Sequence, residues 1–296
     1  MGTVTSATEQ PETPAAGRTA PIPRLIATDL DGTLLRDDKT VSDRTVAALA
    51  AAEAAGLEVF FVTGRPARWM DVVSAHVHGH GLAICANGAA VVDLRDGGRF
   101  VEVRPLGRAD ALAIVVALRA AVPGSSFAVE RTTGFHYEPQ YPPFQLDPAA
   151  VIAPAEEFLA AEAPTEGGDS CGPILKLLAH HPELAPDAFL ARARTAAGDH
   201  GSFTRSSPTA LLEISGPGVS KASTLAGYCA EHGIAPEEVV AFGDMPNDLE
   251  MLGWAGTSYA MANAHPEVLA ATTHRTAANN DDGVAAVIEQ ILHGCP

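Results

Sequence analysis

Three short apolar runs alternate with helical patterns over the first 90 residues of the chain. The runs are residues 25–30, 57–63 and 82–86, and each is followed by a glycine or a polar residue. Runs this short and this apolar are typical of buried parallel strands. Between them, residues 41–55 and 66–75 have helical patterns, the first beginning near Ser42 and ending at Gly56. This β-α-β-α-β order predicts a parallel sheet with right-handed crossovers.

The pattern changes after residue 89. Residues 91–95 and 99–106 flank Asp96-Gly97-Gly98, a hairpin signature, and short strand patterns mixed with helical stretches continue to residue 207. Such a mixture predicts a separate α+β module. The buried-strand pattern then returns in residues 211–214, 239–242 and 258–261, before a closing helix at 284–292.

The pattern as a whole predicts an α/β protein in which one parallel-sheet domain is interrupted by an inserted domain. We place the sheet domain at residues 22–88 and 208–296 and the insert at residues 89–207. Residues 1–21 are rich in Thr, Ala, Pro and Glu, which predicts a disordered tail.

The charge balance narrows the possible partners. Lys and Arg total 19 against 36 Asp and Glu, a net charge of -17, which argues against nucleic-acid and acidic-membrane partners. No apolar run approaches the roughly 18 residues that span a bilayer, and there is no signal-peptide pattern. Gly2 and Ser6 match a myristoylation motif, which we interpret as coincidence because no basic patch accompanies it. Four scattered cysteines without CxxC spacing fit a reducing cytoplasm. No feature implies a protein partner.

The first apolar run ends at a pair of acids, Asp29 and Asp31. Residues two apart on an extended chain point the same way, so both carboxylates would leave the strand on one side. Gly32 allows the backbone to approach a ligand. Because neighbouring carboxylates repel, one of them needs a cation or a proton, which favours metal binding with acid–base chemistry. The alternative is an ordinary surface turn, since Asp-Gly is a common turn dipeptide.

Polar clusters also follow two other strand patterns. Thr63-Gly64 could supply a hydroxyl and a backbone N–H to an anion, and Asp244 and Asp248 could add carboxylates. Ligands of open parallel sheets bind beyond the carboxyl ends of the strands, so the clusters would converge if these strands are neighbours. Several carboxylates with carbonyls and waters suit Mg²⁺. A loop followed by a helix N-cap would also explain residues 243–248.

Lysine is rare in this chain, occurring only as Lys39, Lys176 and Lys221. Lys221 lies at a predicted helix start, where the helix dipole disfavours a cation, so its ammonium group is expected to meet an anion. A solvated surface lysine is the alternative. The three histidines of an HxHxH pattern, His76, His78 and His80, lie in a Gly-rich connection and favour a solvated loop over a metal site.

These motifs together resemble a known family. DLDGTLL, TGR, NGA, GVSK, GDMPNDLEML, ANA and NNDDGVA follow in the order and spacing of the haloacid dehalogenase-like (HAD) hydrolases of the Cof subfamily. The resemblance covers residues 24–89 and 209–292. Ala222 and Ala262 stand where the family often has glycine. The resemblance implies a Rossmann-like parallel-sheet core. The insert resembles the family's type II α+β cap in position and element order only.

The resemblance also implies catalytic roles. Asp29 would attack phosphorus and become an aspartyl-phosphate, and Asp31 would protonate the leaving group and then activate water. Mg²⁺ would be held by Asp29, the backbone carbonyl of Asp31 and Asp244, with Asp248 close by.

Other residues would hold the phosphoryl group. Thr63, Gly64 and Lys221 would clamp its oxygens together with the backbone N–H groups after Asp29, of which Leu30 is the first. Asn247 would support this clamp or the metal shell. The role of Arg65 stays open between a substrate contact and a pair with a core acid, and we favour the pair.

The resulting hypothesis is a Mg²⁺-dependent phosphatase of a small phosphorylated metabolite, such as a sugar or polyol phosphate, with the insert setting specificity. A phosphomutase of the same superfamily is an alternative. A non-catalytic phosphometabolite-binding protein is another, although binding alone does not require the Asp29/Asp31 pair.

Overall fold

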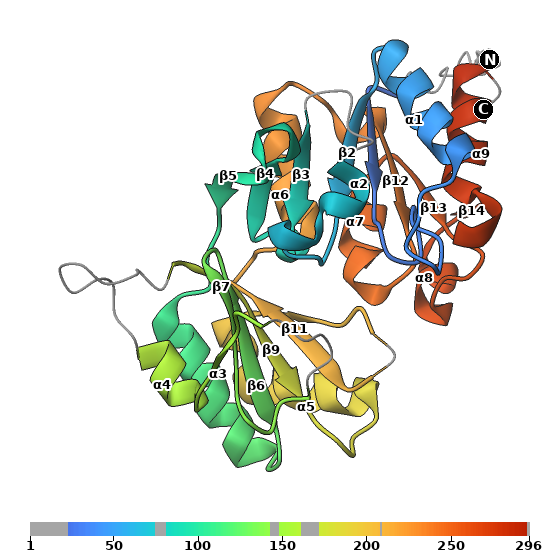
Figure 1. The fold of residues 1–296 in the computed structure, drawn as a ribbon. Coiled ribbons are helices and arrows are strands. Elements are labelled where there is room, and N and C mark those ends of the chain that lie inside the picture. The colour runs from blue at the N-terminus through green and yellow to red at the C-terminus, as the bar shows by residue number, and fades with distance from the viewer. Residues whose placement is uncertain (1–22, 75–80, 143–147, 161–171, 208, 295–296) are drawn as a thin grey trace, which may run out of the picture.

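The computed structural model describes residues 23–74, 81–142, 148–160, 172–207 and 209–294. They form two lobes, each built on one sheet (Figure 1). The predictions for the tail at 1–21, for Gly2 and Ser6, and for the three histidines of the HxHxH pattern lie outside the described residues. Within the described ranges, every helix is too short or too polar to cross a membrane.

The larger sheet has eight strands in the order β14-β13-β12-β1-β2-β3-β4-β5. Six are parallel: β1 (Leu25–Thr28), β2 (Glu58–Val62), β3 (Leu82–Cys85), β12 (Val239–Gly243), β13 (Thr257–Ala260) and β14 (His274–Arg275). Two antiparallel strands close one edge, β4 (Ala90–Asp93) and β5 (Arg99–Val103). All four residues of β1 are buried between β2 and β12, which confirms the strand predicted from its apolar run.

The helices of this lobe are α1 (Asp43–Ala54), α2 (Asp71–Ser74), α6 (Lys221–Glu231), α7 (Leu249–Trp254), α8 (Pro266–Ala271) and α9 (Gly283–Leu292). The α1 helix begins where its sequence predicts, because the Ser42 side chain caps it by accepting from the Thr45 N–H. It packs against α9, and α6 packs against α7 (Figure 1). Short 3-10 helices η2 (Ala86–Gly88) and η6 (Pro246–Asp248) follow β3 and β12.

The smaller sheet has six strands in the order β10-β11-β9-β6-β7-β8. They are β6 (Ser126–Arg131), β7 (Gly134–Tyr137), β8 (Val151–Ile152), β9 (Ile174–His180), β10 (Ser202–Thr204) and β11 (Leu211–Ser215), antiparallel except for the β7–β8 pair. With α3 (Arg108–Ala121), α4 (Ala155–Ala160) and α5 (Pro186–Ala197) they form the lobe that we term the cap.

Alternate residues of the cap strands face opposite ways, as a pleated sheet requires. Phe127, Val129 and Leu177 pack with α3, α4 and α5 in the apolar core of the cap. Leu178 lies with Tyr141 in a smaller cluster that also contacts aromatic residues of β7. This second face of the sheet is directed at the larger lobe, where it helps to line a cavity.

The boundaries between the two domains lie at different residues than we predicted. Residues 91–106 were assigned to the insert, but β4 and β5 extend the larger sheet. Residues 211–214 were assigned to the core, but β11 pairs with β9 and β10 in the cap. A hairpin signature does not say which sheet the hairpin joins, and a buried central strand of a mixed sheet has the same apolar pattern as a parallel core strand. We propose that the inserted domain extends from about residue 104 to 216, in place of 89–207.

Candidate active site

The carboxyl ends of β1, β2 and β12 bring together the polar clusters that follow them. Asp29 comes directly after β1, Thr63 after β2 and Asp244 after β12. The sheet places β1 between the other two strands, so the three ends are adjacent. A backbone hydrogen bond from Asp29 to the Phe242 carbonyl, at 3.1 Å, continues the β1–β12 pairing to the site. The convergence predicted from the sequence is therefore present.

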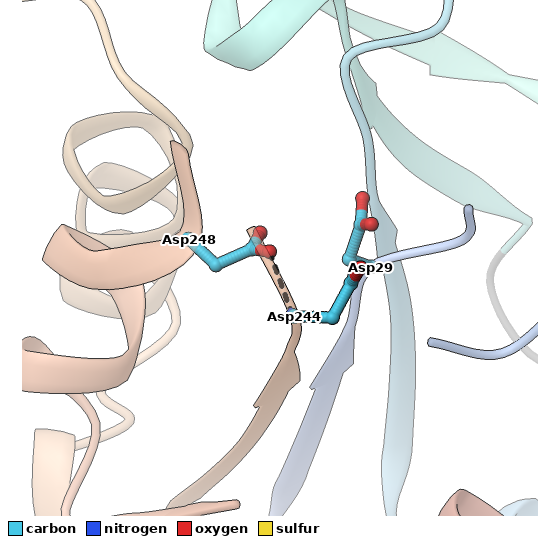
Figure 2. A group of neighbouring side chains, drawn as sticks. All are labelled: Asp29, Asp244 and Asp248. Carbon is cyan, nitrogen blue, oxygen red and sulfur yellow. Dashed lines mark hydrogen bonds between the residues drawn. The ribbon is translucent and has the colours of Figure 1, made fainter. Parts of the chain in front are cut away.

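Three buried carboxylates form the floor of the site. Asp29, Asp244 and Asp248 are 5%, 6% and 0% exposed, and one oxygen from each lies within 4.8 Å of the others (Figure 2). Asp248 comes from η6 and is fixed there, because its Oδ2 accepts the backbone N–H of Asp244 and of Met245, each at 3.0 Å. Carboxylate oxygens held at this spacing are a suitable donor set for a hard divalent cation.

The shape of the loop after β1 depends on a glycine. Gly32 has a φ of +78°, and a Cβ added there would lie 2.3 Å from Asp244 Oδ2. The next residue, Thr33, donates a hydrogen bond at 2.8 Å to the other oxygen of Asp244. The loop after β1 therefore binds the Asp244 carboxylate, which follows the neighbouring strand β12, and leaves room for it.

Lys221 partly neutralises this cluster. Its Nζ lies 2.6 Å from Asp29 Oδ1 and 2.7 Å from Asp248 Oδ1, and the residue is 1% exposed. It begins α6, which a capping box of Ser220 and Ser223 fixes in place. The anion expected for this ammonium group is therefore the carboxylate cluster itself.

One ammonium group does not balance three carboxylates. Burial raises the pKa of Asp29 to about 7, with the charge of Asp248 adding to the rise and Lys221 opposing it. Burial and the charges of Asp29 and Asp248 likewise raise the pKa of Asp244 to about 8. Burial lowers the pKa of Lys221, but the two adjacent carboxylates outweigh this and raise it. The cluster thus has excess negative charge that a proton or a metal cation would neutralise, and the residues fit a Mg²⁺ site.

Asp31 has a different environment from Asp29. Arg65 donates to it from Nε and Nη2 at 2.6 and 2.8 Å, and Lys39 from Nζ at 2.9 Å. Burial alone would raise the pKa of Asp31, but these hydrogen bonds and charges hold it at about 2. Its carboxylate is thus held by Arg65 and Lys39. The metal ligand expected at this residue, its backbone carbonyl, stays a prediction. Arg65 makes the pair with an acid that we favoured.

The predicted phosphate-binding residues lie around the same space. Thr63 and Gly64 line a cavity of about 460 Å³ together with Asn247, Asp29 and Asp31. The Thr63 hydroxyl accepts the Arg65 backbone N–H at 3.1 Å. Leu30 is buried, and its role through a backbone N–H stays a prediction.

The cap closes this cavity with Tyr137, for which a place on the substrate face and a sheet pair were both open from the sequence, and with residues that the sequence did not single out as site candidates. The latter are Glu130, Phe135, Tyr141, Lys176, Leu178, Leu211 and Glu213. Lys176 pairs with Glu213 at 2.5 Å. Because Lys39 contacts Asp31 and Lys221 contacts Asp29, all three lysines of the chain belong to the site. A lysine in the middle of the apolar run 174–179 was the available signal, because buried charges need a partner.

Comparison with known proteins decides the family. A sequence model of the haloacid dehalogenase-like hydrolases matches residues 26–288. The chain belongs to this family. It is 30% identical to the 5-amino-6-(5-phospho-D-ribitylamino)uracil phosphatase YitU of Bacillus subtilis, over 90% of this chain and 97% of that protein. It is 28% identical to the pyridoxal phosphate phosphatase YbhA of Escherichia coli, again over 90% and 97%.

Among solved structures, the HAD subclass IIB sugar phosphatase BT4131 has the same fold, with a TM-score of 0.74. It is 19% identical to this HAD hydrolase and covers 92% of this chain and 100% of that one. The resemblance seen in the motifs is thus confirmed, as are the α/β core and its inserted cap. The chain is a phosphoric monoester hydrolase of the HAD type.

Proposed function

We propose that this hydrolase is a Mg²⁺-dependent phosphatase that acts on a small phosphorylated metabolite through an aspartyl-phosphate at Asp29. The observation that carries the proposal is the difference between the two acids. Asp29 lies buried among carboxylates at the base of the cavity, and Asp31 lies half-exposed against two cations. One acid is suited to act as nucleophile beside a metal, and the other is suited to exchange protons at the leaving group.

Each residue then has a chemical task. An Asp29 oxygen would form a bond to phosphorus as the bond to the leaving oxygen breaks, and Asp31 would supply the proton that this oxygen takes up. In the second half, Asp31 would accept a proton from the water that attacks the phosphorylated Asp29. Lys221, 2.6 Å from Asp29, would orient that carboxylate and balance its charge.

Asp29, Asp244 and Asp248 would hold Mg²⁺, with the backbone carbonyl of Asp31 as a further ligand. When bound, the ion would shield these carboxylates from an incoming phosphate dianion and stabilise charge during transfer.

The cap side of the cavity supports a substrate whose leaving group contains a planar ring. The rings of Phe135, Tyr137 and Tyr141 lie 5.8 to 6.3 Å apart and line one wall. Such a wall favours flat, polarisable groups over a bare sugar. Two relatives are named for substrates of this kind, a phosphoribitylaminouracil and pyridoxal phosphate. We propose that the substrate is a sugar or polyol phosphate, or a similar phosphate ester, whose leaving group carries a planar ring.

A panel of monoesters tests the proposal through release of free phosphate with Mg²⁺. We expect pyridoxal 5′-phosphate to have a higher kcat/KM than ribitol 5-phosphate or glucose 6-phosphate. Phe135→Ala should raise KM for the ring-bearing substrate and spare the sugar phosphate. Release of phosphate from every ester at equal kcat/KM would contradict the ring preference alone. Transfer of phosphate within a sugar, without free phosphate, would favour the mutase alternative.

A further inference from the structure

Charged side chains line the cavity in pairs. Besides Asp29, the described residues of its wall include three carboxylates and four cations, which are Asp31, Glu130 and Glu213, and Lys39, Arg65, Arg68 and Lys176. Each of these cations contacts one of these carboxylates. The internal segments that separate the described ranges contain neither lysine nor arginine in the sequence. The charge that the wall presents to a substrate therefore depends on these pairs.

The surplus positive charge of the wall lies at its catalytic end. Arg65 and Lys39 both bind Asp31, which is two residues after Asp29. That charge is available to the phosphate dianion that the proposed function places beside Asp29. The two pairs that involve the cap, Arg68 with Glu130 and Lys176 with Glu213, are each neutral. The leaving group of the substrate would therefore meet cations that already have carboxylate partners.

The Lys176–Glu213 pair is buried between β9 and β11. The two residues are 6% and 4% exposed. Lys176 Nζ donates to Glu213 Oε2 at 2.5 Å and to the Gly64 carbonyl at 2.8 Å. Burial alone would raise the pKa of Glu213, but the charge of Lys176 and the hydrogen bonds to Glu213 lower it. Glu213 is therefore a carboxylate that holds the Lys176 ammonium group in place.

The Arg68–Glu130 pair joins the two lobes beside the aromatic wall. Arg68 lies in the 3-10 helix η1 (Ala67–Trp69) of the core, and Glu130 lies on β6 of the cap and is 4% exposed. The Arg68 guanidinium carbon is 4.8 Å from the centroid of the Trp69 ring and 5.5 Å from that of Phe135, so both rings also stabilise the cation. A substrate ring packed on Phe135 would lie near this pair.

A second negative charge on the substrate would be costly in this cavity. To bind it, Arg68 or Lys176 would have to leave a buried carboxylate, and a buried charge that loses its partner is strongly destabilising. If the pairs stayed intact, the anion would lose its water next to Glu130 and Glu213 without gaining a cation. A neutral leaving group meets neither difficulty. Unfavourable contacts with the wrong ligand are a general means of specificity.

We propose that Glu130, together with Glu213, is a specificity-determining residue that restricts the enzyme to phosphate esters whose leaving group carries no negative charge. By occupying Arg68 and Lys176, the two carboxylates exclude esters that bear a carboxylate or a second phosphate. The proposal rests on the proposed function and narrows its substrate class from a phosphorylated metabolite to one with an uncharged leaving group.

Two esters of nearly the same shape test the preference. 4-Carbamoylphenyl phosphate and 4-carboxyphenyl phosphate differ by one charge on the ring substituent. For the wild type with Mg²⁺, we expect kcat/KM to be at least about tenfold higher for the amide, and the 3-substituted pair of esters repeats the comparison at another position of the ring. An equal or higher kcat/KM for the carboxylate esters would overturn the proposal.

Glu130→Gln should reverse this discrimination, because it removes the carboxylate that occupies Arg68. We expect the ratio of the two kcat/KM values to fall to within about threefold, and Arg68→Met added to Glu130→Gln should restore it. Glu138→Gln is the matched control, since Glu138 is a buried cap carboxylate that pairs with Arg119 inside the cap. An unchanged ratio in Glu130→Gln, or the same change in Glu138→Gln, would overturn the role of Glu130. If Glu130→Gln does not fold, Glu213→Gln should lower the ratio in the same direction.

Salt separates this local effect from the charge of the whole protein. The net charge of -17 repels anions at long range, but about 0.5 M KCl screens that repulsion and has less effect on buried pairs. A ratio near one at that salt concentration would assign the preference to long-range repulsion and overturn the proposal.

A wild type that releases phosphate from neither ester would refute the proposed function. Calorimetric measurement of Kd for the two esters would then decide the charge preference, and equal affinities, or binding of neither ester, would overturn it.

Discussion

Arg65 binds Asp31 through two hydrogen bonds, from Nε to Oδ2 at 2.6 Å and from Nη2 to Oδ1 at 2.8 Å. This fork is the geometry in which arginine binds a carboxylate most firmly. It holds the proposed acid–base residue in its charged form, with a pKa of about 2. Asp31 is therefore ready to accept a proton from water. It can donate one to a leaving group only after an incoming substrate weakens the pair, so Arg65 sets the proton affinity of the catalytic acid.

Replacing Arg65 by methionine should raise the pKa of Asp31. Burial alone raises that pKa, and only Lys39 would remain to oppose it. We expect the Asp31 carboxyl to titrate at a clearly higher pH in Arg65→Met than in the wild type, where its pKa is about 2. Carbon-13 NMR of labelled aspartate, assigned with Asp31→Asn, measures this. Arg68→Met is the control, because Arg68 lines the same cavity but pairs with Glu130. The same titration in wild type and Arg65→Met would contradict the assignment.

The two acids should respond differently to removal of their charge. Asp29→Asn should abolish turnover on every ester, because an amide does not form the acyl-phosphate, while the fold persists. Asp31→Asn should spare p-nitrophenyl phosphate more than an alkyl phosphate, since a proton matters most for a poor leaving group. The ratio of kcat values for the two esters is the measurement, with circular dichroism as the control for folding. An equal loss on both esters would assign Asp31 a structural role in the loop.

The sequence was sufficient to predict the site residues at the ends of the core strands. It was insufficient to predict the cap residues that line the same cavity. Asp29, Thr63 and Asp244 follow apolar strands directly, so local pattern and parallel topology place them together. Lys176 and Glu213 are 37 residues apart in the chain. They meet at the cavity only because β9 and β11 are neighbouring strands of the cap sheet. Pairing at that distance depends on register between strands, which apolar periodicity does not specify. The same limit explains why β11 was assigned to the wrong sheet.

A methyl group at Gly32 should disable the metal site. The Cβ of Gly32→Ala would lie 2.3 Å from Asp244 Oδ2, so the carboxylate or the loop must move. We expect the Mg²⁺ concentration for half-maximal activity to rise by at least about tenfold, since metal sites depend on ligand placement. Gly97→Ala is a matched control, because Gly97 also has a positive φ, of +61°, but a Cβ there meets nothing within 4 Å. Equal metal dependence in both variants would show that the Asp244 position tolerates the change.

The raised pKa values of the cluster predict how stability depends on pH. Asp29 and Asp244 titrate at about 7 and 8 in the folded protein, against an ordinary value of 3.8. Between pH 4 and 8 these two groups therefore hold more protons in the folded state than in the unfolded state, and their contribution to stability falls as the pH rises through that window. Within this window, excess Mg²⁺ should restore stability most at pH 8, where the carboxylates hold the fewest protons that would compete with it.

Asp244→Asn isolates this effect, because it removes one charge and keeps an oxygen for the Thr33 hydroxyl. Without metal, we expect the variant to melt at a higher temperature than the wild type at pH 8 and at a similar temperature at pH 5. Titration of residues outside the cluster, such as His136 and His180, is common to both proteins and cancels in the difference. Mg²⁺ should raise the melting temperature of the wild type and leave the variant nearly unchanged. A variant that is less stable than wild type at both pH values, or a wild type indifferent to Mg²⁺ at pH 8, would show that the three carboxylates do not form a shared, cation-seeking site.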